Sequence, residues 1–247
     1  MLIEPTLEKL RAMRLSPMAE AYREQQEKPD MGELGFEERF GLLVDAEQIA
    51  RENKRRERLL REAKLKQTRA CMEDIEHAAR RGLDKPTLRR LATCAWVSEC
   101  HNIVITGATG TGKTYLACAL AQQACRKGHR VLYRRASRLF DEMHLARADG
   151  SYVRLLAKIA RMEVLVIDDW ALTTLHEQER HDLLEILEDR AENRSTIMTS
   201  QLPPAKWHEQ IGDPTIADAI LDRILHKAYK IVIKGTSMRK EAKTEAK

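Results

Sequence analysis

The stretch from Gly107 to Thr114 has residue types and a spacing suited to binding phosphate groups. It matches the pattern G-x-x-x-x-G-K-[ST]. Glycines let successive backbone N–H groups turn inward around anionic oxygens, at the helix end whose dipole favours negative charge. In such a loop the lysine contacts the β- and γ-phosphates, and the final hydroxyl binds Mg²⁺. The predicted nucleotide-binding residues are Gly107, Ala108, Thr109, Gly110, Thr111, Gly112, Lys113 and Thr114.

Two adjacent carboxylates, Asp168 and Asp169, have the sequence context expected for the metal side of the same site. They follow the apolar run Val164–Ile167, which predicts a buried strand, and the combination is typical of a Walker B motif. We predict that Asp168 holds Mg²⁺ with Thr114 and that Asp169 orients or polarises the attacking water. Paired carboxylates at strand ends also cap helices, but the phosphate loop favours the metal site. Because binding alone would not need Asp169, the pair predicts hydrolysis.

The predicted nucleotide is ATP. The sequence has no N-K-x-D motif, which is the usual guanine-reading element of GTP-binding proteins. Asn53 and Lys54 begin such a motif, but two arginines follow them and break the pattern.

Five short apolar runs predict the fold that must position these residues. They are Ile103–Ile105, Val131–Tyr133, Val164–Ile167, Thr196–Met198 and Ile231–Ile233. Consecutive apolar residues suit strands that are buried on both faces of a parallel sheet. Helices are expected over Lys113–Lys127, Arg138–Arg147, Tyr152–Arg161, Glu177–Arg190 and Ile216–His226. The alternation predicts a doubly wound α/β domain over residues 101–236, with one helix more than the crossover after the second strand requires.

The region before this domain is predicted to be helical. A shorter helix is expected over about Pro5–Gln26, and one or two long helices over Leu34–Lys66, where strong helix formers dominate. We therefore divide the chain into a helical DNA- or partner-binding domain at residues 1–70, a linker at 71–100, the α/β domain at 101–236 and a basic tail at 237–247.

The long helical region ends in a strongly basic segment. Residues 51–70 carry 9 basic and 3 acidic side chains, whereas residues 1–50 carry 6 basic and 11 acidic ones. Repeated Lys and Arg along a helix can displace counterions from duplex phosphates without reading base sequence. A charged helix face that is merely solvated is the alternative. The candidate DNA contacts are Arg51, Lys54, Arg55, Arg56, Arg58, Arg61, Lys64 and Lys66.

Composition restricts the class of protein. A chain of 247 residues with 43% hydrophobic positions can bury a substantial core, which excludes a disordered chain. No apolar run approaches the roughly 18 residues of a membrane span, and the charged N-terminal stretch is unlike a signal peptide, so a cytoplasmic location is expected. The five cysteines never form C-x-x-C, which argues against a zinc ribbon or a disulfide scaffold.

Three segments taken together resemble the IstB family of insertion-sequence helper ATPases. They are TGATGTGKTYLACALA, VLVIDDWALTTL and STIMTSQLPPAKWHEQIGDPTIADAILDRILHKAYKIVIKGTSMRK. This family belongs to the initiator branch of the AAA+ ATPases, alongside the DnaA initiators and the DnaC helicase loaders. The resemblance covers nearly the whole chain and implies a P-loop AAA+ core preceded by a small all-helical domain.

The resemblance also implies roles for single residues. Gln201 matches the sensor I position near the γ-phosphate, with a polar cap before the two prolines as the alternative. Arg223 matches the arginine finger that reaches a neighbouring subunit's ATP, with an ordinary exposed arginine as the alternative. Arg239 is a candidate sensor II-like nucleotide contact. The extra helix matches the insertion of the initiator branch, so Arg147, Arg154 and Lys158 are further candidate DNA contacts.

Two positions depart from the pattern of the family. Ala171 stands where the family usually has glycine, so a different local turn is expected. Asp169 stands where many AAA+ proteins have glutamate, and the shorter side chain predicts slow hydrolysis.

These observations lead to one principal expectation and three alternatives. The resemblance implies a transposition helper that uses ATP and Mg²⁺, assembles with copies of itself on target DNA and engages a transposase. The alternatives are a DnaC-like replicative helicase loader, a P-loop small-molecule kinase, and a structural DNA-binding protein with a vestigial ATP site.

Overall fold

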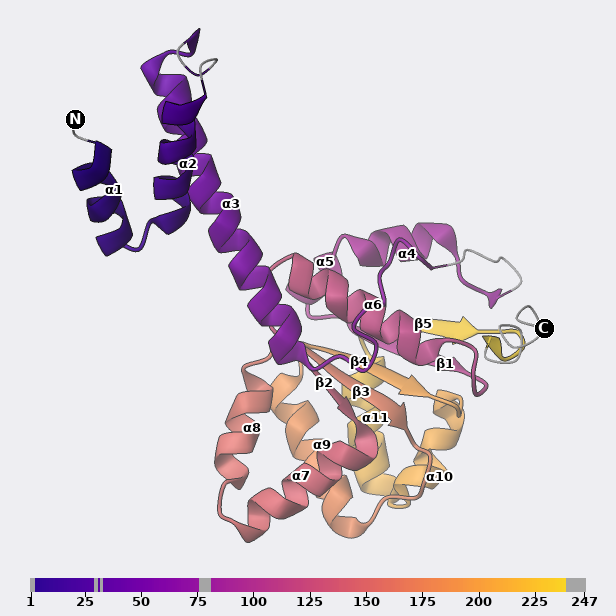
Figure 1. Ribbon diagram of the computed structural model, residues 1–247. Coiled ribbons are helices and arrows are strands. Elements are labelled where there is room, and N and C mark those ends of the chain that lie inside the picture. Colours follow the sequence, from indigo (N-terminus) through magenta and orange to yellow (C-terminus); the bar gives the residue numbers. More distant parts are fainter. Residues whose placement is uncertain (1–2, 29–30, 32, 76–80, 239–247) are drawn as a thin grey trace, which may run out of the picture. The chain divides into compact units, whose positions relative to one another are not determined.

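The computed structural model describes residues 3–28, 31, 33–75 and 81–238 and divides into two compact units (Figure 1). The first unit ends at Arg58 and the second begins at Leu59. The apolar residues that follow this boundary pack in a hydrophobic cluster of the second unit. They are Leu59, Ala63, Leu65 and Ala70. Residues 59–70, which were predicted to belong to the N-terminal domain, therefore pack with the α/β core. The functions assigned to the four predicted segments remain predictions.

The first unit contains α1 (Ile3–Ala12), α2 (Ser16–Glu27) and most of α3 (Phe36–Ala63). The single helix predicted over Pro5–Gln26 is wrong, because the chain breaks between α1 and α2. Arg14 adopts a left-handed conformation there, with φ +61°, and a proline occupies the first turn of α2. The long helix predicted after Leu34 is confirmed as α3.

The second unit is built on a five-stranded parallel sheet, as predicted. The strands are β1 (Asn102–Gly107), β2 (Val131–Arg135), β3 (Val164–Trp170), β4 (Ser195–Ser200) and β5 (Ala228–Ile233). Their order across the sheet is β2-β3-β4-β1-β5, and every neighbouring pair is parallel. All five apolar runs lie within these strands. The α/β fold class is therefore confirmed.

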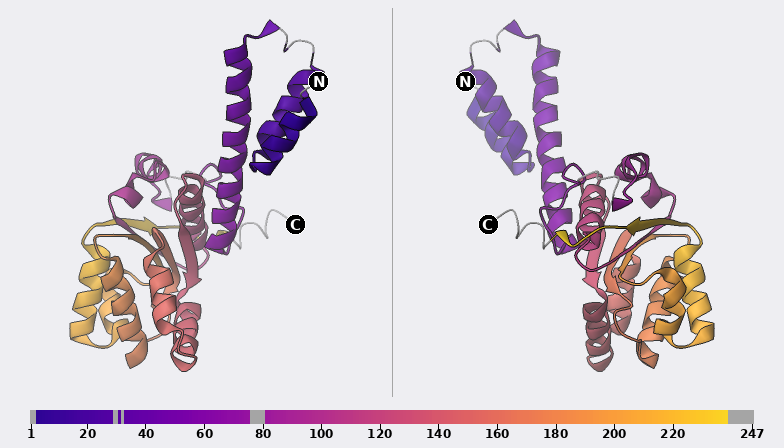
Figure 2. Two further views of the ribbon diagram at one scale, coloured as in Figure 1. Left: turned by 90° about the vertical axis from the view of Figure 1, so that its left-hand side faces the viewer. Right: turned by 90° about the vertical axis from the view of Figure 1, so that its right-hand side faces the viewer.

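Helices cover both faces of the sheet (Figure 2). One face packs against α4 (Lys85–Ala92), α5 (Ala95–Ser98) and α6 (Lys113–Arg126). The other packs against α7 (Ala136–Ala148), α8 (Tyr152–Ala160), α9 (Glu177–Arg190), α10 (Trp207–Ile211) and α11 (Pro214–Leu225). Side chains of β1 alternate between the two clusters, with Ile103 and Ile105 on the first face and Val104 on the second. The sheet is thus buried on both sides, which explains its continuous apolar runs.

Two helices, α7 and α8, connect β2 to β3, as the length of that connection predicted. Further short elements complete the unit. The 3₁₀ turn η3 (Pro204–Lys206) precedes α10, and Asp84 and Asp213 cap α4 and α11 by accepting backbone N–H groups. All five cysteines are free thiols.

Candidate functional site

The phosphate-binding loop lies between the end of β1 and the start of α6, where the sequence pattern requires it. Gly107 has φ +153°, and a Cβ on it would lie 2.4 Å from the carbonyl oxygen of Ile233, so only glycine fits there. The Nζ atom of Lys113 donates to the carbonyl oxygens of Gly107 and Ala108, at 2.7 and 2.8 Å. The ammonium is therefore held inside the loop. Burial lowers the pKa of Lys113, and the charges of Asp169 and Asp168 oppose that shift.

Asp168 lies fully buried on β3 and accepts hydrogen bonds from three hydroxyl groups. Thr114 Oγ1 lies 3.0 Å from each carboxylate oxygen, Tyr133 Oη lies 2.6 Å from Oδ2, and Thr199 Oγ1 lies 2.6 Å from Oδ1. Burial and the bond to Asp168 raise the pKa of the Tyr133 hydroxyl, which keeps it a donor. The pairing of the Thr114 hydroxyl with the Asp168 carboxylate offers two hard oxygen donors side by side, which fits Mg²⁺.

Asp169 faces the cavity and forms an ion pair with Arg135, which ends β2. The Arg135 Nε and Asp169 Oδ2 atoms lie 3.0 Å apart, and the Asp169 N–H donates to Thr199 Oγ1 at 3.0 Å. The register between β3 and β4 shifts across these two aspartates. Asp169 and Ala171 both adopt left-handed backbone conformations, with φ +57° and +58°. A glycine would adopt this conformation at position 171 without steric cost, whereas the alanine costs about 1 kcal/mol there.

Gln201 follows β4 and points at the phosphate loop. Its Oε1 atom accepts a hydrogen bond of 2.7 Å from Thr109 Oγ1. The sensor candidate therefore contacts one of the predicted nucleotide-binding residues across the sheet.

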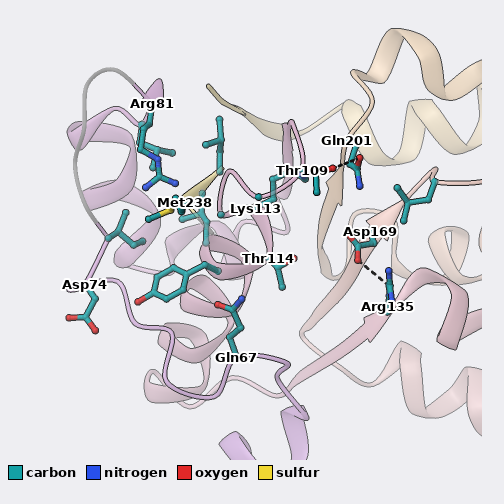
Figure 3. Close-up of a pocket in the computed structure, with 18 residues that line it drawn as sticks. Gln67, Asp74, Arg81, Thr109, Lys113, Thr114, Arg135, Asp169, Gln201 and Met238 are labelled. Carbon is teal, nitrogen blue, oxygen red and sulfur yellow. Dashed lines mark hydrogen bonds and ion pairs between the residues drawn. The ribbon is translucent and has the colours of Figure 1, made fainter. Parts of the chain in front are cut away.

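Several of these residues line one cavity of about 580 Å³, and the buried Asp168 reaches it through its bonds to Thr114 (Figure 3). Lys113 and Thr114 lie on its wall, with Gln201, Asp169 and Arg135 on one side of them and Arg81 and Met238 on the other. Apolar side chains line it together with these polar ones. Its apolar lining is Ile75, Leu83, Leu116, Leu172, Ile233 and Met238. A cavity lined by both charged and apolar groups suits a nucleotide, which carries charged phosphates and a base with apolar faces.

Arg223 lies elsewhere, near the C-terminal end of α11. Its carbonyl oxygen accepts a hydrogen bond from the side-chain amide of Asn102, which begins β1. Its guanidinium forms an ion pair of 2.7 Å with Glu188 of α9 and donates to the carbonyl oxygen of Ala219. Arg223 lines a second cavity of about 300 Å³ rather than the phosphate cavity. It is therefore separated from its own phosphate loop, which is a condition for acting on a neighbour. Arg239 lies outside the described residues.

The candidate DNA contacts on α3 are exposed. One face of α3 carries the buried residues Leu43 and Glu47. Further along the helix, the same face carries a cationic stripe of three solvent-exposed residues, Arg51, Lys54 and Arg58. Arg56 points the opposite way, about 140° around the helix from Arg51, and bonds to Asn53. The remaining candidates Arg55, Arg61, Lys64 and Lys66 are exposed, and the Nζ atom of Lys66 lies 4.0 Å from Asp168 Oδ2. Among the insertion candidates, Arg147 pairs with Asp182 and packs on the Tyr152 ring.

Sequence reasoning missed four residues of this site: Tyr133, Arg135, Thr199 and Arg81. The first three lie at or near the carboxyl ends of strands β2 and β4, which flank β3. Polar residues at the ends of predicted neighbouring strands were the available signal. Arg81 lies in the predicted linker, where the sequence offers none.

The fold and the site together define a P-loop protein of the AAA+ class. The model of the IstB-like ATP-binding protein family matches residues 8–246. The chain belongs to this family. It is 45% identical over 246 residues to an insertion-sequence ATP-binding protein named y4pL in Sinorhizobium fredii, covering all of both chains. It is 48% identical over 203 residues to the ATP-binding protein named for insertion sequence IS1162 in Pseudomonas fluorescens, covering 82% of this chain and 88% of that one.

Solved structures show the same fold. The DnaI structure superposes with a TM-score of 0.58 at 23% identity, over 72% of this chain and 94% of that one. The DnaC helicase loader gives 0.55 at 21% identity, over 67% and 97%. AMPPCP-bound DnaA from Aquifex aeolicus gives 0.57 at 19% identity, over 72% and 54%. No helix in the described part of the chain is long and apolar enough to span a membrane.

Proposed function

We propose that this protein is an ATP-dependent transposition helper, which hydrolyses ATP, assembles with copies of itself on target DNA and recruits or activates a transposase. The insertion-sequence relatives support the biological setting, because two of them are named as ATP-binding proteins of such elements.

The convergence of Lys113, Thr114, Asp169 and Gln201 on one cavity carries the proposal, together with the bond of Thr114 to the buried Asp168. The loop N–H groups and Lys113 bind the triphosphate, with the Lys113 ammonium exchanging its carbonyl partners for phosphate oxygens. Thr114 and Asp168 would hold Mg²⁺, which neutralises phosphate charge when bound. Asp169 orients the attacking water, and for this it must first release Arg135. Gln201 turns from Thr109 toward the γ-phosphate.

Assembly is proposed to follow from the position of Arg223. Its side chain does not line its own phosphate cavity and is 28% exposed, so a neighbouring protomer can present its ATP to it. The charge that develops in the transition state would then be stabilised from the adjacent subunit. This contact competes with Glu188, whose ion pair holds Arg223 in the single chain.

Sizing of the protein with duplex DNA tests the proposal. ATP is expected to produce a larger DNA-bound assembly than ADP, and Lys113→Ala to abolish the difference, because the triphosphate can no longer be held. Identical assemblies and DNA affinities with ATP, with ADP and without nucleotide would contradict it. They would favour a structural DNA-binding protein instead. Recovery of a replicative helicase with the protein, or a strong preference for single strands, would favour the helicase-loader alternative.

A further inference from the structure

One end of the nucleotide cavity has no role in the proposed hydrolysis. Figure 3 shows Arg81 and Met238 on the side of Lys113 that is opposite to Gln201 and Asp169. If the γ-phosphate lies beside Asp169 and Gln201, the nucleoside must lie at the Arg81 end. Leu83 and Ile233 are buried core residues that also line the cavity, so they supply apolar wall at this end beside the charged Arg81 and Asp74. Apolar walls suit a base better than a phosphate.

The backbone from Arg81 to Leu83 is held in place by contacts with the sheet and its core. Its carbonyl oxygen accepts a hydrogen bond of 2.9 Å from the N–H of Lys234, just after β5. Two residues further on, the Leu83 side chain is buried in the cluster that includes α6 and β5. Arg81 is therefore anchored to the strand next to β1, and its side chain starts from a defined place at the cavity rim.

The guanidinium of Arg81 is held against the phosphate loop. Its Nη2 atom donates to the carbonyl oxygen of Thr111, and a Cβ placed on Gly112 would lie 2.8 Å from that same atom. The loop thus binds one edge of the group, which lies directly against Gly112. Arg81 still lines the cavity, so its planar group forms part of the wall at the nucleoside end.

We propose that Arg81 is a nucleotide-binding residue that packs its guanidinium against the purine base of the bound nucleotide. The inference rests on the proposed function, because it requires ATP in this cavity with its phosphates at the loop. An arginine is suited to this role, since its flat, weakly hydrated cation stacks on π-systems. The bond to Thr111 limits the freedom of the group before the ligand arrives, so less conformational entropy is lost on binding.

Calorimetric titration with ATP, ADP and inorganic tripolyphosphate tests the role of Arg81. Arg81→Ala is expected to weaken ATP and ADP binding about tenfold each and to leave tripolyphosphate binding unchanged, because only the nucleotides carry a base. Arg81→Gln keeps a planar group and an N–H donor for Thr111, and it is expected to lose less affinity. Arg89→Ala removes an exposed arginine of α4 outside the cavity and is the matched control. Thermal unfolding without nucleotide checks that each variant is folded.

The outcomes separate this inference from the proposed function. Equal losses for ATP and tripolyphosphate would make Arg81 a phosphate ligand and overturn the base contact. Unchanged ATP binding in both Arg81 variants would overturn it as well. A wild-type protein that binds no ATP would instead refute the proposed function, and the inference with it. Should Arg81→Ala fail to fold, the comparison of Arg81→Gln with wild type decides.

Discussion

The buried carboxylate of Asp168 depends on hydroxyl groups rather than on a close cation. Three hydroxyls from α6, β2 and β4 donate to it within 3.0 Å, while the nearest ammonium, that of Lys66, lies 4.0 Å away. A fully buried carboxylate is costly unless its oxygens accept hydrogen bonds. The hydroxyls therefore stabilise the carboxylate that we propose to hold Mg²⁺, in the absence of nucleotide.

Removal of one donor to Asp168 should be measurable as a loss of stability. Tyr133→Phe is expected to lower the free energy of unfolding of the nucleotide-free protein by about 2 kcal/mol, because the carboxylate stays buried with one hydrogen bond fewer. Urea unfolding followed by circular dichroism measures this. Tyr229→Phe, on β5 and away from Asp168, is the control and should change stability little. Equal stability of Tyr133→Phe and wild type would show that this bond contributes nothing net.

The ion pair between Arg135 and Asp169 predicts restrained hydrolysis. Asp169 cannot accept a proton or orient water through an oxygen that pairs with Arg135. Arg135→Ala should raise the turnover rate up to about fivefold, which corresponds to about 1 kcal/mol for a half-exposed pair. Asp169→Asn should nearly abolish turnover. Single-turnover assays with saturating ATP measure both, and a slower rate in Arg135→Ala would instead assign the arginine to the phosphates.

At the scale of elements, the sequence predicted the strands well and the partners of the site residues poorly. Val164–Ile167 could be assigned to a buried strand because local apolar residues define such a strand by themselves. The contacts of Asp168 with Tyr133 and Thr199 depend on β2 and β4 flanking β3, and that order arises from long-range pairing. The break at Arg14 was not predicted, because helix formers surround this arginine and nothing in its residue type indicates a left-handed conformation.

One buried arginine joins three elements at the amino-terminal ends of the strands, the end of the sheet away from the phosphate loop. Arg190, at the end of α9, donates to the carbonyl oxygens of Ile159 and Met162 near α8 and to the carbonyl and hydroxyl oxygens that begin β4. Burial lowers its pKa to about 9, and no carboxylate is among these partners. The guanidinium therefore acts as a hydrogen-bonded junction.

Replacement of this junction should destabilise the α/β unit strongly. Arg190→Leu is expected to cost on the order of 3 kcal/mol and to lower the midpoint of thermal unfolding by about 10 °C, because several buried acceptors lose their donor. Differential scanning calorimetry measures it. Arg194→Leu, a nearby change without these buried contacts, should shift the midpoint far less. Similar midpoints for the two variants would contradict the role of Arg190.

The cationic stripe of α3 predicts a directional DNA interface. Lys54→Ala combined with Arg58→Ala should reduce the slope of log K against log salt by about 2, since each lost phosphate contact releases about one counterion fewer. Arg56→Ala changes the opposite side of the helix and should leave the slope unchanged. Fluorescence anisotropy over a salt series measures it. An equal effect of Arg56→Ala would mean that the helix binds DNA without a preferred face.

At the scale of the whole molecule, function is proposed to require two protomers, since Arg223 and the phosphate loop do not share a cavity. Arg223→Ala and Lys113→Ala should each be inactive alone. An equimolar mixture should regain roughly one quarter of wild-type turnover if protomers mix at random, because one interface in four then combines an intact loop with an intact arginine. Steady-state hydrolysis with DNA measures this. A mixture as inactive as its components would place the action of Arg223 within its own chain.

The crowding around Gly107 constrains how the gene can change over time. A methyl group there would collide with the backbone of Ile233, whatever ligand is present or absent. Selection for a properly folded chain thus preserves this glycine even in a descendant that has abandoned nucleotides altogether. In such a lineage a retained Gly107 would indicate only the fold. Nucleotide binding would have to be judged from Lys113, Asp168 and Asp169.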